Sequence, residues 1–130
     1  MVGIVLISHS AGIARGTAEL VGQIARGVRV EPAGGTEDGR IGTSTERIAA
    51  AIAAADTGDG VLLLPDLGSS VLSALSVLAD VDPDATGKRI VLADAPFIEG
   101  AVAAAVAASA GFDLATVATA AEEARDVHKL

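Results

Sequence analysis

The chain has 130 residues, 51% of them hydrophobic, and a formal net charge of −8 at pH 7. This negative charge argues against nucleic acids and anionic membranes as partners. The absence of cysteine excludes disulfides, thiolate metal sites and cysteine catalysis. No apolar run is long enough to span a bilayer, and the N-terminus lacks a basic segment. We therefore expect one domain over residues 1–130 and a cytoplasmic protein.

Apolar runs of strand length alternate along the chain with alanine-rich stretches of helix length. In chain order we predict a strand at residues 2–7, a helix at 13–25, a short strand at 28–30, a loop at 31–42, a helix at 43–56, a strand at 60–65, a helix at 69–80, a strand at 88–94, and helices at 98–110 and 113–126. The loop contains four glycines and one proline, and loops of this length are often functional.

The predicted strands are continuous apolar runs, which is typical of strands buried on both faces of a parallel sheet. Their alternation with helices predicts an α/β fold with right-handed crossovers. In such folds the site lies beyond the carboxyl ends of the strands, where the strand order reverses. His9 follows the first strand and Asp66 follows the third. If these strands are neighbours, as in the order 2-1-3-4, the two residues meet.

His9 lies between two serines at the end of a predicted strand. It is either a polar residue that caps the strand or part of a functional site. A neutral imidazole is a good acceptor for a phosphoryl group or a proton near pH 7. Asp66 either caps the next helix or holds one ring nitrogen of His9, so that the other nitrogen is a free nucleophile. His128, three residues from the end, forms no cluster with other histidines, so we expect no metal site.

Small and hydroxyl residues near these two positions are candidates for binding phosphate. They are Ser10 directly after His9, Gly35 and Thr43 in and next to the glycine-rich loop, and Gly68 and Ser69 at the predicted start of a helix. The glycine-rich loop lacks the lysine of a nucleotide-binding P-loop. We therefore expect no nucleotide or other cofactor on this chain.

Four segments in order, "IVLISHSAGIARGTAEL", "AGGTEDGRIGTSTERI", "LLLPDLGSSVLSAL" and "LADAPFIEGA", resemble the mannose-type enzyme IIA family of the bacterial phosphotransferase system. The "GTS" and "APFIEGA" segments resemble the branch that serves phosphoenolpyruvate-dependent dihydroxyacetone kinases. The resemblance implies a mostly parallel four-stranded sheet in the order 2-1-3-4, helices on both faces, and a homodimer.

The resemblance also implies a mechanism. His9 would accept a phosphoryl group from the phosphocarrier HPr, and Asp66 would orient it. Phospho-His9 would pass the group to ADP on the ADP-binding kinase subunit, and the resulting ATP would phosphorylate dihydroxyacetone on a third subunit. HPr and enzyme I would be separate proteins.

Three alternatives remain open at this stage. The chain could be an enzyme IIA that feeds a mannose-type sugar permease. It could be a sensor whose phosphorylation state is recognised by a transcription regulator. It could be a tetrapyrrole metal chelatase, since those enzymes also place a histidine after the first strand. A chelatase needs a second histidine or acidic ligands, and the only other histidine is His128.

Overall fold

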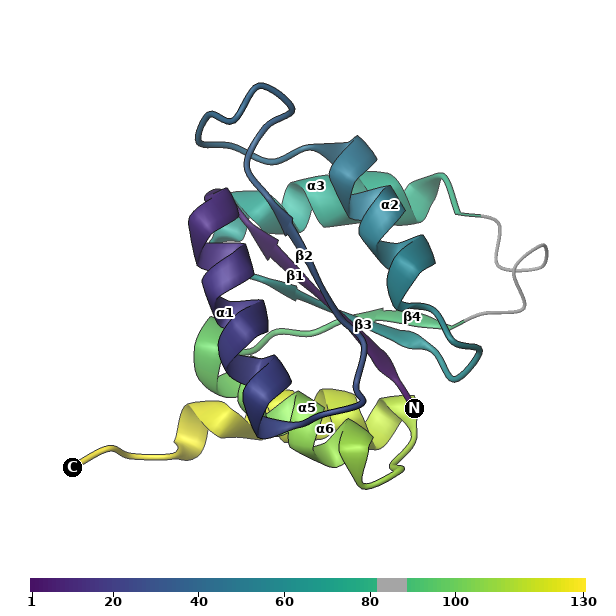
Figure 1. The fold of residues 1–130 in the computed structure, drawn as a ribbon, viewed down its shortest axis with the longest axis vertical. Coiled ribbons are helices and arrows are strands. Elements are labelled where there is room, and N and C mark those ends of the chain that lie inside the picture. The colour runs from purple at the N-terminus through teal and green to yellow at the C-terminus, as the bar shows by residue number, and fades with distance from the viewer. Residues whose placement is uncertain (82–88) are drawn as a thin grey trace.

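A computed structural model describes residues 1–81 and 89–130, and it shows the predicted α/β class (Figure 1). The elements are β1 (Gly3–Ser8), α1 (Ala11–Ile24), β2 (Val30–Gly34), α2 (Thr45–Ala55), β3 (Val61–Pro65), α3 (Gly68–Ala79), β4 (Ile90–Leu92), α5 (Phe97–Ser109) and α6 (Leu114–Glu123), with a 3₁₀ turn at Ala124–Asp126. Lys88, the predicted first residue of the fourth strand, lies outside the described residues.

The four strands form one parallel sheet in the order β2-β1-β3-β4, which confirms the predicted order. β1 and β3 are central neighbours, and Ile7 pairs with Pro65. Ser8 and Asp66, the next residues along these two strands, therefore lie side by side at the carboxyl edge of the sheet. Figure 1 shows α1 and α3 beginning at this edge.

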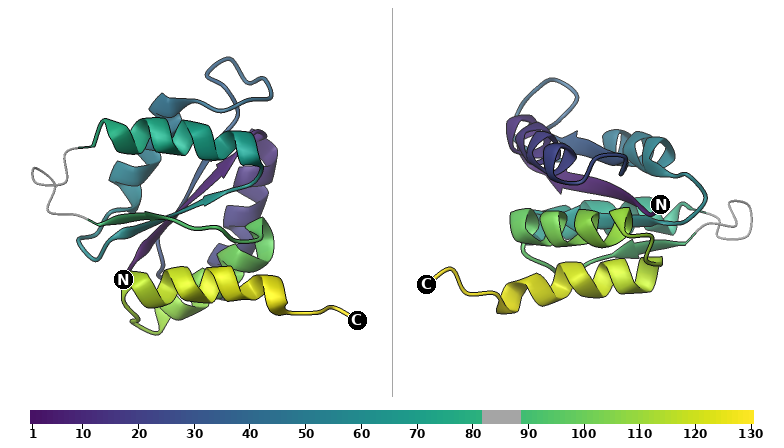
Figure 2. Two further views of the ribbon diagram at one scale, coloured as in Figure 1. Left: turned by 180° about the vertical axis from the view of Figure 1, so that it is seen from behind. Right: turned by 60° about the horizontal axis from the view of Figure 1, so that its bottom comes forward.

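The core consists of two apolar layers, because successive strand residues point to opposite faces of the sheet. Ile4 and Leu6 pack on the side of α1, α5 and α6, while Val5 and Ile7 pack on the side of α2 and α3. Figure 2 shows the strands between these helices. Each such buried side chain contributes about 1.5–3 kcal/mol. The helices supply many alanines, and this allows close helix-on-sheet packing without a single buried aromatic residue among those described.

The second strand differs from the prediction of a strand at 28–30 and a loop at 31–42. β2 begins at Val30 and continues to Gly34, so the residues from Glu31 to Gly34 are strand and not loop. The sequence conceals this strand because Pro32 cannot donate a ladder hydrogen bond. It is tolerated because β2 pairs only with β1 and is an edge strand.

Gly34 allows the end of β2 to approach the start of α1. A Cβ atom there would lie 2.6 Å from the carbonyl oxygen of Ser10 and 2.8 Å from the Cβ of Ala14. A larger residue would therefore push α1 away from the sheet edge that carries His9.

No helix in the described part of the chain combines the length and hydropathy needed to cross a membrane.

Candidate active site

His9 and Asp66 meet at the carboxyl edge of the sheet, directly after β1 and β3. The Nδ1 atom of His9 lies 3.0 Å from Oδ1 of Asp66. The side chains are 20% and 12% exposed, so the pair is mostly enclosed but open to solvent on one side. A carboxylate can only accept a hydrogen bond, so this contact places the ring proton on Nδ1. The lone pair of a neutral ring is then on Nε2.

The carboxylate of Asp66 accepts four hydrogen bonds. Oδ1 accepts the contact from His9 Nδ1 and one from the amide of Leu67 at 2.7 Å. Oδ2 accepts from the Ser8 hydroxyl at 2.8 Å and from the amide of His9 at 3.1 Å. Burial acts to raise the pKa of Asp66, but these hydrogen bonds together outweigh it and hold that pKa below its ordinary value. The carboxylate is therefore charged at neutral pH.

Ser8 is a site residue that the sequence analysis did not identify. It is fully buried as the last residue of β1, and its hydroxyl donates to Asp66 while accepting from the amide of Ser10 at 3.1 Å. The pairing of β1 with β3 is what places Ser8 beside Asp66. Pro65 pairs with Ile7, so the residue after each lies at the same edge of the sheet.

Ser69, in the first turn of α3, contacts the other side of the imidazole. Its hydroxyl oxygen lies 2.6 Å from Nε2 of His9. Because the ring proton is on Nδ1, the hydroxyl donates to Nε2. A phosphoryl group bonded to Nε2 would occupy this direction, and the same hydroxyl could then donate to a phosphoryl oxygen. The neighbouring Gly68 opens α3, and a Cβ atom there would meet open space.

Three other candidates for binding phosphate have structural contacts. The Ser10 hydroxyl accepts the amide of Ile13 and so caps α1. The amide of Gly35 donates to the carbonyl of Ser8 at 3.1 Å. The hydroxyl oxygens of Thr43 and Ser73, on α3, lie 2.5 Å apart. Their contacts with a phosphoryl group stay predictions.

The glycine-rich loop nevertheless supports the histidine directly. The amide of Gly42 donates to the carbonyl oxygen of His9 at 2.9 Å, and Gly35 has a positive φ of 74° at the start of the loop. The loop therefore holds the backbone of His9 from the side of β2. Thr43 connects the same loop to α3.

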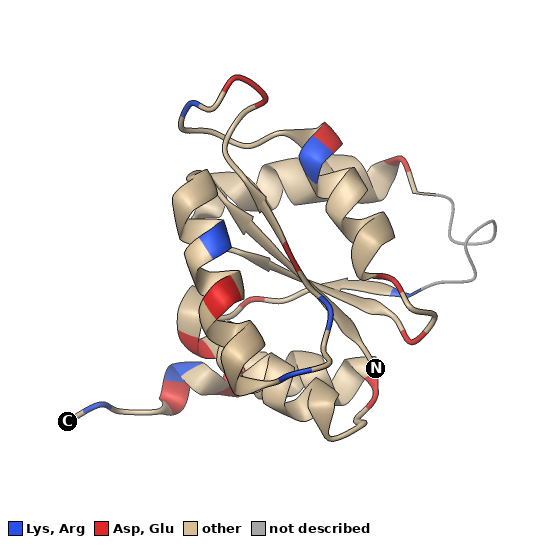
Figure 3. Ribbon diagram, viewed as in Figure 1, with Lys and Arg blue, Asp and Glu red and all other residues tan. Residues whose placement is uncertain are grey.

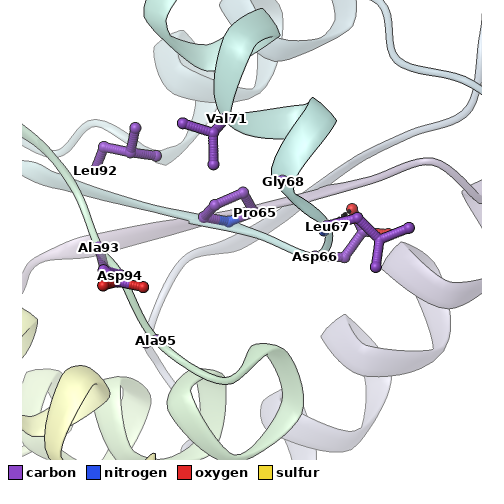
Figure 4. Close-up of a pocket in the computed structure, with 9 residues that line it drawn as sticks. All are labelled: Pro65, Asp66, Leu67, Gly68, Val71, Leu92, Ala93, Asp94 and Ala95. Atoms are coloured by element: carbon purple, nitrogen blue, oxygen red, sulfur yellow. Dashed lines mark hydrogen bonds between the residues drawn. The ribbon is translucent and has the colours of Figure 1, made fainter.

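A pocket of about 320 Å³ lies beside the carboxylate (Figure 4). It is bounded by the turn from β3 to α3 at Pro65–Gly68, by Val71, and by the Leu92–Ala95 segment after β4. His9 is not among the residues that line it. The Nε2 side of the His9 ring is instead next to Ser69 in the first turn of α3.

Within residues 1–81 and 89–130, no group of three histidine, cysteine or acidic side chains is placed to hold a metal ion. His128 is exposed in the C-terminal tail. The tail packs near the start of α5, where the neighbouring Lys129 lies 3.1 Å from Glu99. The site is therefore built from one imidazole, one carboxylate, hydroxyls and backbone amides.

This fold is that of a phosphotransferase-system IIA domain, and the chain belongs to that family. The family model described as "PTS system fructose IIA component" matches residues 3–118. A crystal structure of a protein of unknown function, EF1359, superimposes with a TM-score of 0.84 at 33% identity and covers 95% of each chain.

Similar proteins within the family carry a more specific description. The phosphoryl donor subunit DhaM of a phosphoenolpyruvate-dependent dihydroxyacetone kinase from Listeria innocua is 41% identical over 103 residues, which are 79% of this chain and 78% of that protein. The phosphotransferase subunit DhaM from Lactococcus lactis is 36% identical and covers 84% of both chains. The Escherichia coli DhaM subunit is 35% identical over 88% of this chain, which spans 25% of that longer protein.

Proposed function

We propose that this chain is the phosphoryl-carrier subunit of a dihydroxyacetone kinase, with His9 as the residue that carries the phosphoryl group. The observation that supports it best is the His9–Asp66 contact at 3.0 Å, which leaves Nε2 as the nucleophile at an accessible edge. The names of its relatives, phosphoryl donor subunits of such kinases, supply the substrate class.

The transfer balances without any further reactant. Nε2 of His9 attacks the phosphorus of phospho-HPr, the N–P bond of the donor breaks, and its electron pair returns to the donor imidazole. The proton on Nδ1 of His9 stays there, hydrogen-bonded to Asp66, so the carboxylate compensates the positive charge that grows on the ring. Phosphoryl transfer depends mainly on such positioning and charge stabilisation.

In the second transfer, the phosphoryl group moves from Nε2 to the terminal phosphate of ADP on the ADP-binding kinase subunit. The ATP formed there phosphorylates dihydroxyacetone on the dihydroxyacetone-binding subunit. This division of labour fits a chain whose sequence contains no P-loop. The carrier itself needs no cofactor for either step.

A sugar permease is the alternative acceptor, because its enzyme IIA uses the same histidine chemistry. The DhaM relatives favour the kinase over the permease. A chelatase has no observation in its favour, since the described residues bring no group of three histidine, cysteine or acidic side chains together at His9. A regulator that recognises phospho-His9 is compatible with the carrier role.

The proposal includes a homodimer. Four of the six alanines of α5 are buried within the chain and so cannot form an interface with a second copy. The structure offers another surface, a largely apolar groove between α5 and α6 lined by residues that include Ile98, Val102 and Val127. Ile98 and Val127 are exposed in the single chain, so a second copy could cover them.

The test is labelling of His9 from phosphoenolpyruvate by enzyme I and HPr. We expect one acid-labile phosphate per chain in the wild type and none in His9→Ala. Adding the two kinase subunits, ADP and dihydroxyacetone should then discharge the phosphoprotein. Equal labelling of His9→Ala would overturn the carrier role, whereas labelling without discharge would overturn only the kinase as acceptor.

A further inference from the structure

The exposed side of α3 carries no charge, and large apolar residues alternate there with the serines Ser69 and Ser76. None of the twelve residues of α3 is Lys, Arg, Asp or Glu, and Figure 3 shows the helix without charged positions along its length. Every other helix labelled in Figure 1 carries at least one charged residue, for example Arg15 on α1 and Glu46 on α2. The outer side of a surface helix is normally polar and charged. α3 is therefore unusual among the helices of this domain.

Three large apolar side chains project from this element. Leu72 is 70% exposed, Leu75 is 50% exposed, and Leu67, directly before the helix, is 62% exposed. We refer to these three residues as the α3 leucine face. They are not needed for the core, because α3 buries the opposite side of the helix, with Ala74 and Val77, against the sheet.

The α3 leucine face is continuous with the candidate active site. Ser69 lies one helical turn before Leu72, so the two side chains share a side of the helix. The Ser69 hydroxyl contacts Nε2 of His9 at 2.6 Å. Leu67 follows Asp66 and donates its amide to that carboxylate. The α3 leucine face therefore begins beside Asp66 and Ser69, the two residues whose side chains contact the His9 ring.

A partner must touch this end of the face to reach the histidine. The side chain of His9 is only 20% exposed, so a phosphoryl group held on another protein reaches Nε2 only when the two surfaces are in contact. The phosphoryl group is an anion, and this chain carries a net charge of −8. An uncharged, partly apolar surface beside the nucleophile allows close approach without opposing charge and adds apolar contact area.

Resting on the proposed function, we propose that the α3 leucine face is the docking surface for the protein that donates the phosphoryl group to His9. The partner that fits it is a phosphohistidine carrier whose phosphoryl group is surrounded by apolar side chains. The docking contacts are apolar, and charge complementarity on α3 makes no contribution. Leu72 is the most exposed of the three residues and is the best position for a test.

The experiment measures the initial rate of His9 labelling against the concentration of phospho-HPr for wild type, Leu72→Glu and Leu72→Lys. At low phospho-HPr we expect both variants to be labelled more slowly by about tenfold or more, since residues central to an interface contribute over 1 kcal/mol each. Either charge would have to be desolvated against apolar side chains. If the two charges instead changed the rate in opposite directions, electrostatic attraction would govern docking and the proposal would be wrong.

A small phosphoryl donor separates docking from chemistry. Phosphoramidate needs no protein contact, and its P–N bond is replaced by the bond to Nε2 with release of ammonia. We expect it to label wild type, Leu72→Glu and Leu72→Lys equally. A Leu72 variant that loses labelling by both donors would show that Leu72 supports the site itself, which contradicts docking.

Leu20→Glu is the matched control, because Leu20 is 45% exposed and lies in the second half of α1, away from the start of that helix. It should be labelled by phospho-HPr at the wild-type rate. Leu72 variants labelled as fast as this control would overturn the docking proposal and leave the carrier role intact. If neither donor labelled the wild type, both the docking proposal and the carrier role would be overturned. Sedimentation tests whether a second copy of the chain covers the α3 leucine face. If the wild type were a dimer and Leu72→Glu dissociated it, the face would be a dimer interface, and the docking proposal would be wrong.

Discussion

Replacing Asp66 by asparagine preserves the size of the side chain and removes its charge and one of its two acceptors. The carboxylate accepts the ring Nδ1 proton and the Leu67 amide at Oδ1, and the Ser8 hydroxyl and the His9 amide at Oδ2. An asparagine has one oxygen for these four donors and presents an NH₂ group to the others. The structure therefore allows two orientations of the new amide.

Each orientation of the asparagine amide fails in a different way. With its oxygen at the position of Oδ1, the NH₂ group faces the His9 amide, and Nδ1 keeps its proton but loses the compensating charge. With its oxygen at the position of Oδ2, the NH₂ group faces Nδ1 and the Leu67 amide, so the ring proton must move to Nε2 and block the nucleophile. Both leave a backbone N–H unpaired, which costs about 1–3 kcal/mol of stability.

We expect the substituted protein to remain folded and to be labelled more slowly by a factor on the order of 10² or more, the range of general acid–base contributions. Such a factor corresponds to about 2.7 kcal/mol in the activation barrier. The assay is the initial rate of His9 labelling by phospho-HPr and by phosphoramidate. Both rates should fall, because the defect is in the nucleophile. Nitrogen NMR of the His9 ring should show proton occupancy on Nε2 increasing.

Asp113→Asn is the control for the chemical change. Asp113 caps α6 through the amide of Thr116, and α6 begins where Leu114 packs beside Gly60, at the amino edge of the sheet. Its labelling rate should match wild type. If Asp66→Asn also labelled at nearly the wild-type rate, Asp66 would have only a structural role. Such a role would not be to cap α3, because the N-cap is Leu67 and no side chain caps that helix.

Two further predictions concern stability and assembly. Because the pKa of Asp66 is lower in the folded chain than its ordinary value of about 3.9, its stabilising effect is complete above that value and is lost as the pH falls through the lower folded pKa. The difference in urea unfolding free energy between wild type and Asp66→Asn should therefore shrink below about pH 4, and a constant difference would contradict this. The wild type should sediment as a dimer at roughly tens of micromolar and Ile98→Glu as a monomer, whereas a monomeric wild type would rule out the groove between α5 and α6 as an interface.

The apolar runs of the sequence predicted a parallel sheet, the resemblance to the family implied its order 2-1-3-4, and that order predicted the meeting of His9 with Asp66. Continuous apolar runs mark strands buried on both faces, and parallel strands end at the same edge. β2 was predicted poorly because its pairing with β1, and not its own composition, makes it a strand. Glu31 and Pro32 are poor strand residues, and both are placed by the neighbouring strand.

Ser8 shows why a binding partner for a carboxylate is hard to recognise in a sequence. In the run "GIVLIS" a final serine looks like the end of an apolar strand, and a buried hydroxyl has no purpose until its acceptor is known. The acceptor, Asp66, is 58 residues away in the chain. A carboxylate that must remain charged while mostly enclosed needs several donors, and His9 alone supplies only two. Once the register of β1 and β3 is known, the residue before the histidine must be small and must donate. Serine satisfies both requirements, and its hydroxyl supports the carboxylate that we propose orients His9.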